Sequence, residues 1–103
     1  MTYGVVWSES TEPVHAGSLE LADTSLLLAG TSNGSRDSRR ELSFDELVDV
    51  WIERGSSARL GGRPTLVLRL RAGRLVRIAS VEGRGALHEL AGRLADARRQ
   101  TAA

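Results

Sequence analysis

The stretch that decides the fold runs from Pro64 to Arg98 and reads PTLVLRLRAGRLVRIASVEGRGALHELAGRLADAR. Aliphatic residues occupy every second position in its first two segments, namely Leu66, Leu68 and Leu70, then Val76 and Ile78. Alternation with a period of two is typical of strands that bury one face. The stretch therefore predicts a β-hairpin, and the residues that follow predict a helix.

The loop length of this hairpin decides which residues face each other. With a two-residue loop, Leu68 would lie opposite Arg77 and the aliphatic face would carry a charge. With a three-residue loop that ends at Gly73, Leu68 lies opposite Val76 and the core stays free of charge. We therefore predict the three-residue loop, with Gly73 at positive φ, because such loops usually end in a left-handed residue at a bulge.

A helix of about 84–99 is predicted after the hairpin. Its apolar residues recur at helical spacing and form one stripe, made of Leu87, Leu90, Ala91 and Leu94. The opposite face is polar and includes His88. Gly92 costs about 1 kcal/mol relative to alanine inside a helix, so it predicts close packing against a neighbouring backbone.

The chain before this stretch predicts five further strands. They are Tyr3 to Trp7, two strands of a hairpin within Val14 to Gly30 that turns at 22–25, Glu41 to Phe44, and Val48 to Ile52. A single helical turn capped by Ser43 is expected over 45–47. Three polar segments are expected to be loops, namely Ser8 to Pro13, Thr31 to Arg40 and Gly55 to Arg63.

The strand from Val48 to Ile52 is predicted to point Val48, Val50 and Ile52 inward. Trp51 would then lie on the outer face, between the carboxylates of Asp49 and Glu53.

Composition limits the classes of function. The chain has 103 residues and no cysteine, which predicts a single domain over 1–103 and excludes disulfides, thiolate catalysis and cysteine-bound metal. Its 14 basic and 13 acidic residues give a net charge of +1, which argues against nucleic acid as a partner. Every basic residue is arginine rather than lysine, which indicates a GC-rich bacterial genome. We expect a cytoplasmic protein without an integral membrane segment, because no leader pattern and no long apolar run is present.

Seven predicted strands followed by one helix give an element order that resembles the pleckstrin-homology-like (PH-like) fold, including bacterial PH and GRAM-type domains. Three stretches carry the resemblance: Gly17-x-Leu19-x-Leu21 with Leu26-x-Leu28, then Leu42 to Val50, then the hairpin with LHELAGRLADA. The resemblance implies a mainly β fold with one C-terminal α-helix. Its bent antiparallel seven-stranded barrel would be capped by the helix of about 84–99.

The resemblance also bears on ligands. Phosphoinositide-binding PH domains carry basic residues around their first hairpin turn. Here the candidate turn, Ala22 to Ser25, contains one acid and no base, and the alternative loop, Ser8 to Pro13, contains two glutamates. Both assignments argue against phosphoinositide binding.

No catalytic, metal or cofactor site is predicted. The two histidines, His15 and His88, are expected at a strand start and on the polar helix face, and neither has partners at a recognisable catalytic or metal-ligand spacing.

The predicted function is therefore a non-enzymatic protein-interaction or scaffold module, acting on a protein partner or by self-association. Its candidate surface is the outer face of the sheet, made of Asp49, Trp51, Glu53, Val67, Arg69, Leu75 and Arg77. Aromatic, aliphatic and arginine side chains together suit a protein interface, although the N-terminal strand could instead cover Trp51. The alternative function is a small-ligand or lipid-binding module that uses the barrel mouth.

Overall fold

Seven antiparallel strands and one long helix make up most of this computed structural model, which describes residues 2–10, 13–32, 36–53 and 63–102. The elements in chain order are β1 (Thr2–Glu9), β2 (His15–Leu21), β3 (Ser25–Ser32), β4 (Arg36–Ser43), the 3-10 turn η1 (Phe44–Glu46), β5 (Leu47–Glu53), β6 (Thr65–Leu70), β7 (Leu75–Ser80) and α1 (Arg84–Ala102). The predicted number and order of strands are confirmed.

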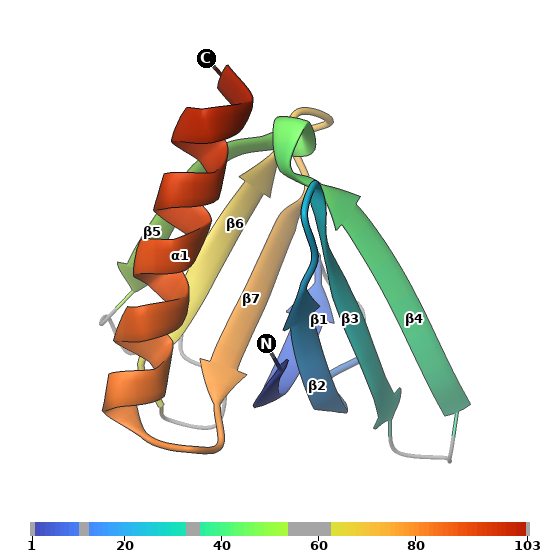
Figure 1. The fold of residues 1–103 in the computed structure, drawn as a ribbon. Helices are drawn as coiled ribbons and strands as arrows, with labels where there is room; N and C mark the ends of the chain where they lie inside the picture. The colour runs from blue at the N-terminus through green and yellow to red at the C-terminus, as the bar shows by residue number, and fades with distance from the viewer. Residues whose placement is uncertain (1, 11–12, 33–35, 54–62, 103) are drawn as a thin grey trace.

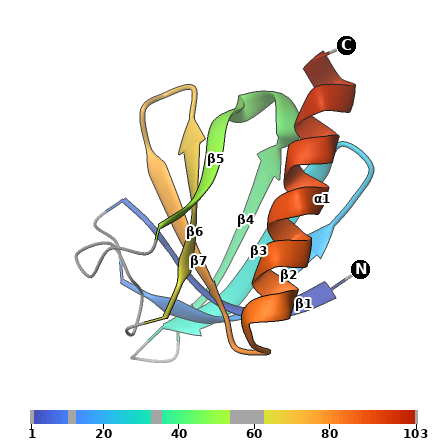
Figure 2. The same cartoon turned by 90° about the vertical axis from the view of Figure 1, so that its left-hand side faces the viewer.

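The strands form one sheet in the order β4-β3-β2-β1-β7-β6-β5. β1 and β7 lie far apart in the sequence, yet they pair along their length, with Val5 opposite Ser80 and Trp7 opposite Ile78. The sheet curls into a half-barrel, and α1 lies across its open side (Figures 1 and 2). This is the predicted architecture, a bent seven-stranded sheet of PH-like form that one C-terminal helix caps.

The hairpin of β6 and β7 has the predicted register. Leu68 lies opposite Val76, and Leu66 lies opposite Ile78. Gly73 has a φ of 85°, and its N–H donates to the Leu70 carbonyl at 2.9 Å. The three-residue loop therefore keeps the paired inward positions of this hairpin aliphatic, as expected.

The helix α1 packs its leucine stripe into the core. Leu87, Leu90 and Leu94 are all buried, against η1, β5, β6 and β7. Burying three leucines contributes on the order of 5–8 kcal/mol as an upper bound. The helix continues to Ala102, a few residues beyond its predicted end. The packing predicted for Gly92 is wrong, because a Cβ placed there would meet no atom within 4 Å.

The segment predicted as a loop over Thr31 to Arg40 is mostly strand, so that prediction is wrong. β3 extends to Ser32, and β4 pairs with it along its whole length from Arg36 to Ser43. β4 is an edge strand whose first six residues are all polar, and backbone ladder bonds form regardless of side-chain polarity. Apolar alternation therefore predicted only its end, in the strand expected over Glu41 to Phe44, and Phe44 itself belongs to η1.

The strand β5 begins with a bulge that changes which residues point inward. The register against β6 shifts between Leu47 and Asp49. Leu47 consequently takes the inward position and is buried, whereas Val48 is 40% exposed. The prediction that Val48 points inward is therefore wrong, while Val50 and Ile52 do pack against the core. The 3-10 turn before β5 is present as predicted, and the Ser43 N–H donates to Glu46 Oε2 at 3.2 Å.

A buried carboxylate lies at the end of β1, where a polar loop was predicted. β1 continues through Ser8 and Glu9, and both side chains are buried. Glu9 accepts two hydrogen bonds from Arg40 of β4, at 2.8 and 3.2 Å, and its Oε2 lies 3.2 Å from Arg74 Nε. The hydrogen bonds from Arg40 hold the pKa of Glu9 below its ordinary value, against the opposing effect of burial. This cluster links β1, β4 and the turn between β6 and β7.

Candidate functional site on the outer face of the sheet

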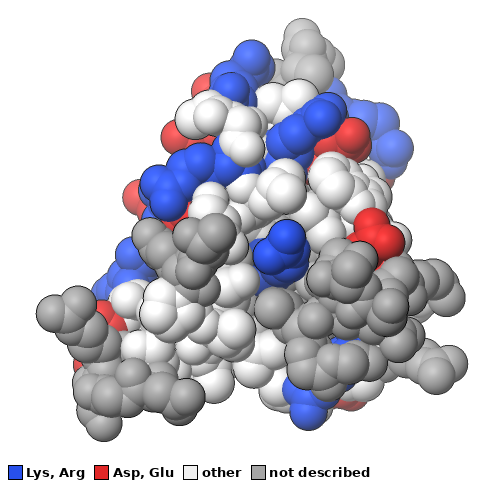
Figure 3. All heavy atoms as spheres, turned by 180° about the vertical axis from the view of Figure 1, so that it is seen from behind, with Lys and Arg blue, Asp and Glu red and all other residues white. Residues whose placement is uncertain are grey.

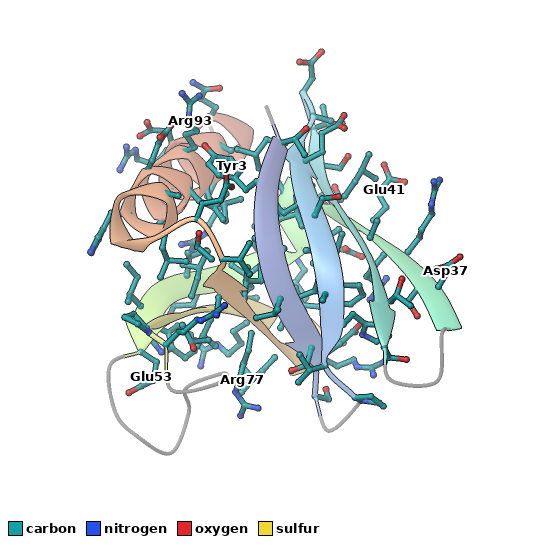
Figure 4. The ribbon with its side chains drawn as sticks, turned by 90° about the horizontal axis from the view of Figure 1, so that it is seen from below. Tyr3, Asp37, Glu41, Glu53, Arg77 and Arg93 are labelled. Atoms are coloured by element: carbon teal, nitrogen blue, oxygen red, sulfur yellow. The ribbon has the colours of Figure 1, made fainter. Side chains whose placement is uncertain are left out.

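The seven residues predicted as an interaction surface lie on one face of β5, β6 and β7. Two cross-strand rows contain six of them: Asp49, Arg69 and Leu75 in one, and Trp51, Val67 and Arg77 in the other. Glu53 follows two positions after Trp51 on the same face. We call these seven residues the outer-face patch. Glu53 and Arg77 project on the side of the sheet away from α1 (Figure 4).

The residues of the patch differ in accessibility. Val67 is only 2% exposed, so it contributes packing rather than contact area, despite its outward direction. Arg69 is exposed, and the side chains of Trp51, Leu75 and Arg77 are partly buried. Uncharged side chains occupy much of the middle of the molecule when it is seen from behind the view of Figure 1 (Figure 3). The usable surface therefore mixes partly buried apolar side chains with charged ones, and Arg69 lies between Asp49 and Leu75.

Trp51 is not covered by the N-terminal strand. β1 pairs with β2 and β7, and two strands separate it from β5. The Trp51 indole N–H lies 3.4 Å from Glu53 Oε2, which is a long contact. Within the rows of the patch, Trp51 is instead the neighbour of Val67. Trp51 is therefore partly exposed on β5 and is not covered by β1.

The charges of the patch are weakly paired. Arg69 Nη2 lies 3.6 Å from Asp49 Oδ2, and both side chains are 49% exposed. Exposed ion pairs of this kind contribute less than about 1 kcal/mol. Arg69 and Asp49 can therefore give up their ion pair and bind charged groups of a partner at a small cost in free energy.

The strand β5 presents a free edge beside the patch. The Val50 N–H donates to the neighbouring Asp49 Oδ1 at 2.9 Å, and the Val48 carbonyl accepts from Arg98 Nη2 at 2.6 Å. These bonds show that alternate peptide groups of β5 face away from β6. The Val50 carbonyl and both peptide groups of Ile52 face the same edge, and within the described part of the chain no hydrogen bond engages them.

The sequence reasoning missed the second tryptophan and its histidine neighbour. Trp7 is buried on the inner face of β1, and its indole N–H donates to the Ala29 carbonyl at 3.1 Å. His15 stacks on Trp7 with ring centroids 4.6 Å apart, so it is a buried packing residue rather than a surface residue. His15 Nδ1 has no hydrogen-bond partner among the described residues. Gly30 leaves room for the indole, because a Cβ there would lie 3.1 Å from Trp7 Nε1.

Tyr3 lies close to α1. Its hydroxyl donates to Glu89 Oε1 at 3.3 Å, and Figure 4 shows Tyr3 beside the helix near Arg93. Burial raises the pKa of Tyr3, and the nearby Glu89 carboxylate raises it further. The contact joins β1 to the helix that caps the half-barrel.

Among the described residues, no cluster of three or more histidine, aspartate and glutamate side chains could hold a metal ion. None of the helical residues described forms a segment long and apolar enough to cross a membrane.

The sequence was also compared with models of known protein families and with functionally curated proteins, and neither comparison finds a match.

Proposed function

We propose that this chain is a non-enzymatic PH-like module that binds a protein partner through the outer-face patch and the adjoining free edge of β5. The observation that carries the proposal is the position of Trp51. This large aromatic side chain lies on an edge strand, beside peptide groups that have no partner within the described residues. Tryptophan is enriched among the residues that dominate binding energy at interfaces, and a free strand edge can accept an extended segment of another chain.

The charge pattern of β5 favours a different protein over a second copy of this chain. Two copies could join their β5 edges in an antiparallel register that pairs Val50 with Ile52 of the other copy. Asp49 of one copy would then lie opposite Glu53 of the other, and like charges placed directly opposite each other are destabilising. A partner segment with basic residues flanking an apolar one would complement the same pattern.

The test begins with a benzophenone amino acid in place of Arg77, which lies in the same cross-strand row as Trp51 and leaves Trp51 intact. On illumination in an extract of the source organism, it captures a neighbouring protein. The captured protein is then purified, and its affinity for the unlabelled chain is measured by titration calorimetry. Trp51→Ala should weaken binding at least tenfold, as expected for an aromatic hot spot. Leu27→Ala is the matched control, because Leu27 is an exposed apolar residue on β3, outside the patch.

An affinity that Trp51→Ala leaves unchanged would contradict the proposal. Sedimentation velocity at two concentrations tests the alternative of self-association. A dimer that Trp51→Ala abolishes would show that a second copy of the chain is the partner.

A further inference from the structure

A cleft of about 470 Å³ lies where the last turns of α1 meet η1, the start of β5 and the turn between β6 and β7. Its apolar lining comes from Phe44, Leu47, Val48 and Ala95. Three arginines, Arg71, Arg98 and Arg99, also line it. We call this feature the basic cleft. It lies apart from the outer-face patch and shares no residue with it.

Two of these arginines are held in place by backbone carbonyls rather than by carboxylates. Arg71 Nε donates to the Asp45 carbonyl at 2.6 Å, and Arg98 Nη2 donates to the Val48 carbonyl at 2.6 Å. Within the described residues, neither guanidinium group forms an ion pair. Both guanidinium groups are therefore anchored at the cleft, and no described carboxylate neutralises them. Arg99 differs, because it pairs with Asp96 on its own helix.

The cleft contains one acidic side chain, Asp45, which is engaged locally. Asp45 Oδ1 accepts a hydrogen bond from Ser43 Oγ at 2.7 Å, and it forms no ion pair with Arg71. Arg99 is compensated by Asp96, so Arg71 and Arg98 against Asp45 leave the lining with a net positive charge. Fixed guanidinium groups bind carboxylates well, because their planar donors match the two carboxylate oxygens.

The bulge in β5 supplies the apolar contact next to these charges. It turns Val48 out of the core, so that a β-branched side chain is 40% exposed in the cleft wall. Val48 thus combines two features of the cleft, because its carbonyl anchors Arg98 and its side chain offers apolar surface. An apolar group bound beside the two arginines would cover this exposed side chain.

We propose that the basic cleft binds a segment of a partner protein in which a carboxylate side chain is next to an apolar side chain. The carboxylate lies between Arg71 and Arg98, and the apolar side chain covers Val48 and Ala95. Charge complementarity selects an acidic segment rather than a basic one. The proposal does not rest on the outer-face patch, because no residue of the patch lines the cleft.

The probe is the peptide acetyl-Gly-Asp-Phe-Asp-Gly-amide, titrated to millimolar concentration into the isotope-labelled full chain and followed by backbone amide NMR. The expected result is saturable shifts at 44–48, 71 and 95–99, with no comparable shifts in the outer-face patch. Peptides with asparagine in place of aspartate, or serine in place of phenylalanine, should bind at least tenfold more weakly. Binding should also weaken as the salt concentration rises.

Variants of the cleft test the assignment of the residues. Arg71→Gln and Arg98→Gln should each weaken binding at least tenfold, and Arg93→Gln on another face of α1 is the matched control. Val48→Asp is a second test. It changes only an exposed side chain and keeps the backbone carbonyls that Arg71 and Arg98 contact. It should weaken binding by repelling the ligand carboxylate, while the amide spectrum stays that of a folded chain.

Equal binding of the asparagine peptide, or shifts located elsewhere, would overturn the proposal. So would shifts at the cleft that appear with phosphatidylglycerol vesicles and not with the aspartate peptide, because the ligand would then be a lipid surface. The proposal for the outer-face patch would survive either failure, since it is measured with Trp51→Ala and a different partner.

Discussion

The two halves of the curled sheet, β6 with β7 and β1 with β2 and β4, bury different kinds of side chain. The inward positions that pair within the β6 and β7 hairpin are all aliphatic and buried. The inward positions of β1, β2 and β4 also include Trp7, Glu9, His15 and Arg40, which bond or stack across strands. An aliphatic half is stabilised by the area it removes from water. The other half also depends on particular pairs of polar groups that must meet.

Removing α1 should destabilise the fold more than any single substitution. A chain that ends at Ser80 loses the three buried leucines that cover the aliphatic half, a contribution comparable to the net stability of a small domain. We expect it to be unfolded by circular dichroism and amide NMR. The control ends at Gln100 and keeps all three leucines. A folded, monomeric chain without α1 would show that the sheet is stable without its cap.

Leu68→Ala should cost about 3 kcal/mol of unfolding free energy. Leu68 is 0% exposed at the centre of the hairpin, and truncating a buried leucine leaves a cavity that the packed core fills only partly. Urea denaturation followed by circular dichroism measures the cost. Leu27→Ala, at an exposed leucine on β3, should cost less than about 1 kcal/mol. Equal costs at both positions would contradict the assignment of Leu68 to the core.

Glu9→Gln should cost about 2 kcal/mol near pH 7, because it leaves Arg40 and Arg74 without their buried carboxylate. The pKa of Glu9 is lower in the folded chain than its ordinary value. Its contribution to stability is therefore present above the ordinary glutamate pKa of about 4.3 and is lost as the pH falls through the folded value.

The unfolding free energies of the parent chain and of Glu9→Gln should thus converge as the pH falls below the ordinary glutamate pKa of about 4.3 and through the lower value of folded Glu9. Denaturation curves between pH 3 and 7 measure this difference, with the exposed Glu20→Gln as the control. A difference between the two chains that did not change with pH would show that Glu9 acts through packing rather than through its charge.

Gly73→Ala should cost about 1 kcal/mol, because Gly73 has a φ of 85°, where a side chain is strained. Gly92→Ala is the matched substitution within α1. It should stabilise the chain by up to about 1 kcal/mol, because nothing lies within 4 Å of the added Cβ. The midpoint temperature of thermal unfolding should therefore fall for Gly73→Ala and rise for Gly92→Ala. A shift of both in the same direction would contradict one of the two local conformations.

Asp49→Asn should have the smallest effect, less than about 0.5 kcal/mol, because its ion pair with Arg69 is half exposed. Double-mutant analysis with Arg69→Gln measures the coupling. A coupling above about 1 kcal/mol would show that the pair is a structural element and is not available to a partner.

Local patterns in the sequence determined the hairpin, its register, the position of Gly73, the leucine stripe of α1 and the single turn after Ser43. Each of these depends on residues a few positions apart, whose spacing and turn geometry the sequence displays directly. The same alternation placed all seven residues of the outer-face patch on one face. It could not show that Val67 is buried there, because burial depends on what packs around a side chain.

Tertiary structure alone decided the rest. The first six residues of β4 have no apolar pattern, and only their pairing with β3 makes them a strand. Glu9 and Arg40 are separated by 31 residues, and they become partners only when the sheet curls. The bulge at Val48 and the anchoring of Arg98 on its carbonyl likewise join the start of β5 to the end of α1. Such contacts depend on the curvature of the sheet and on the position of the helix, which arise when the whole core packs.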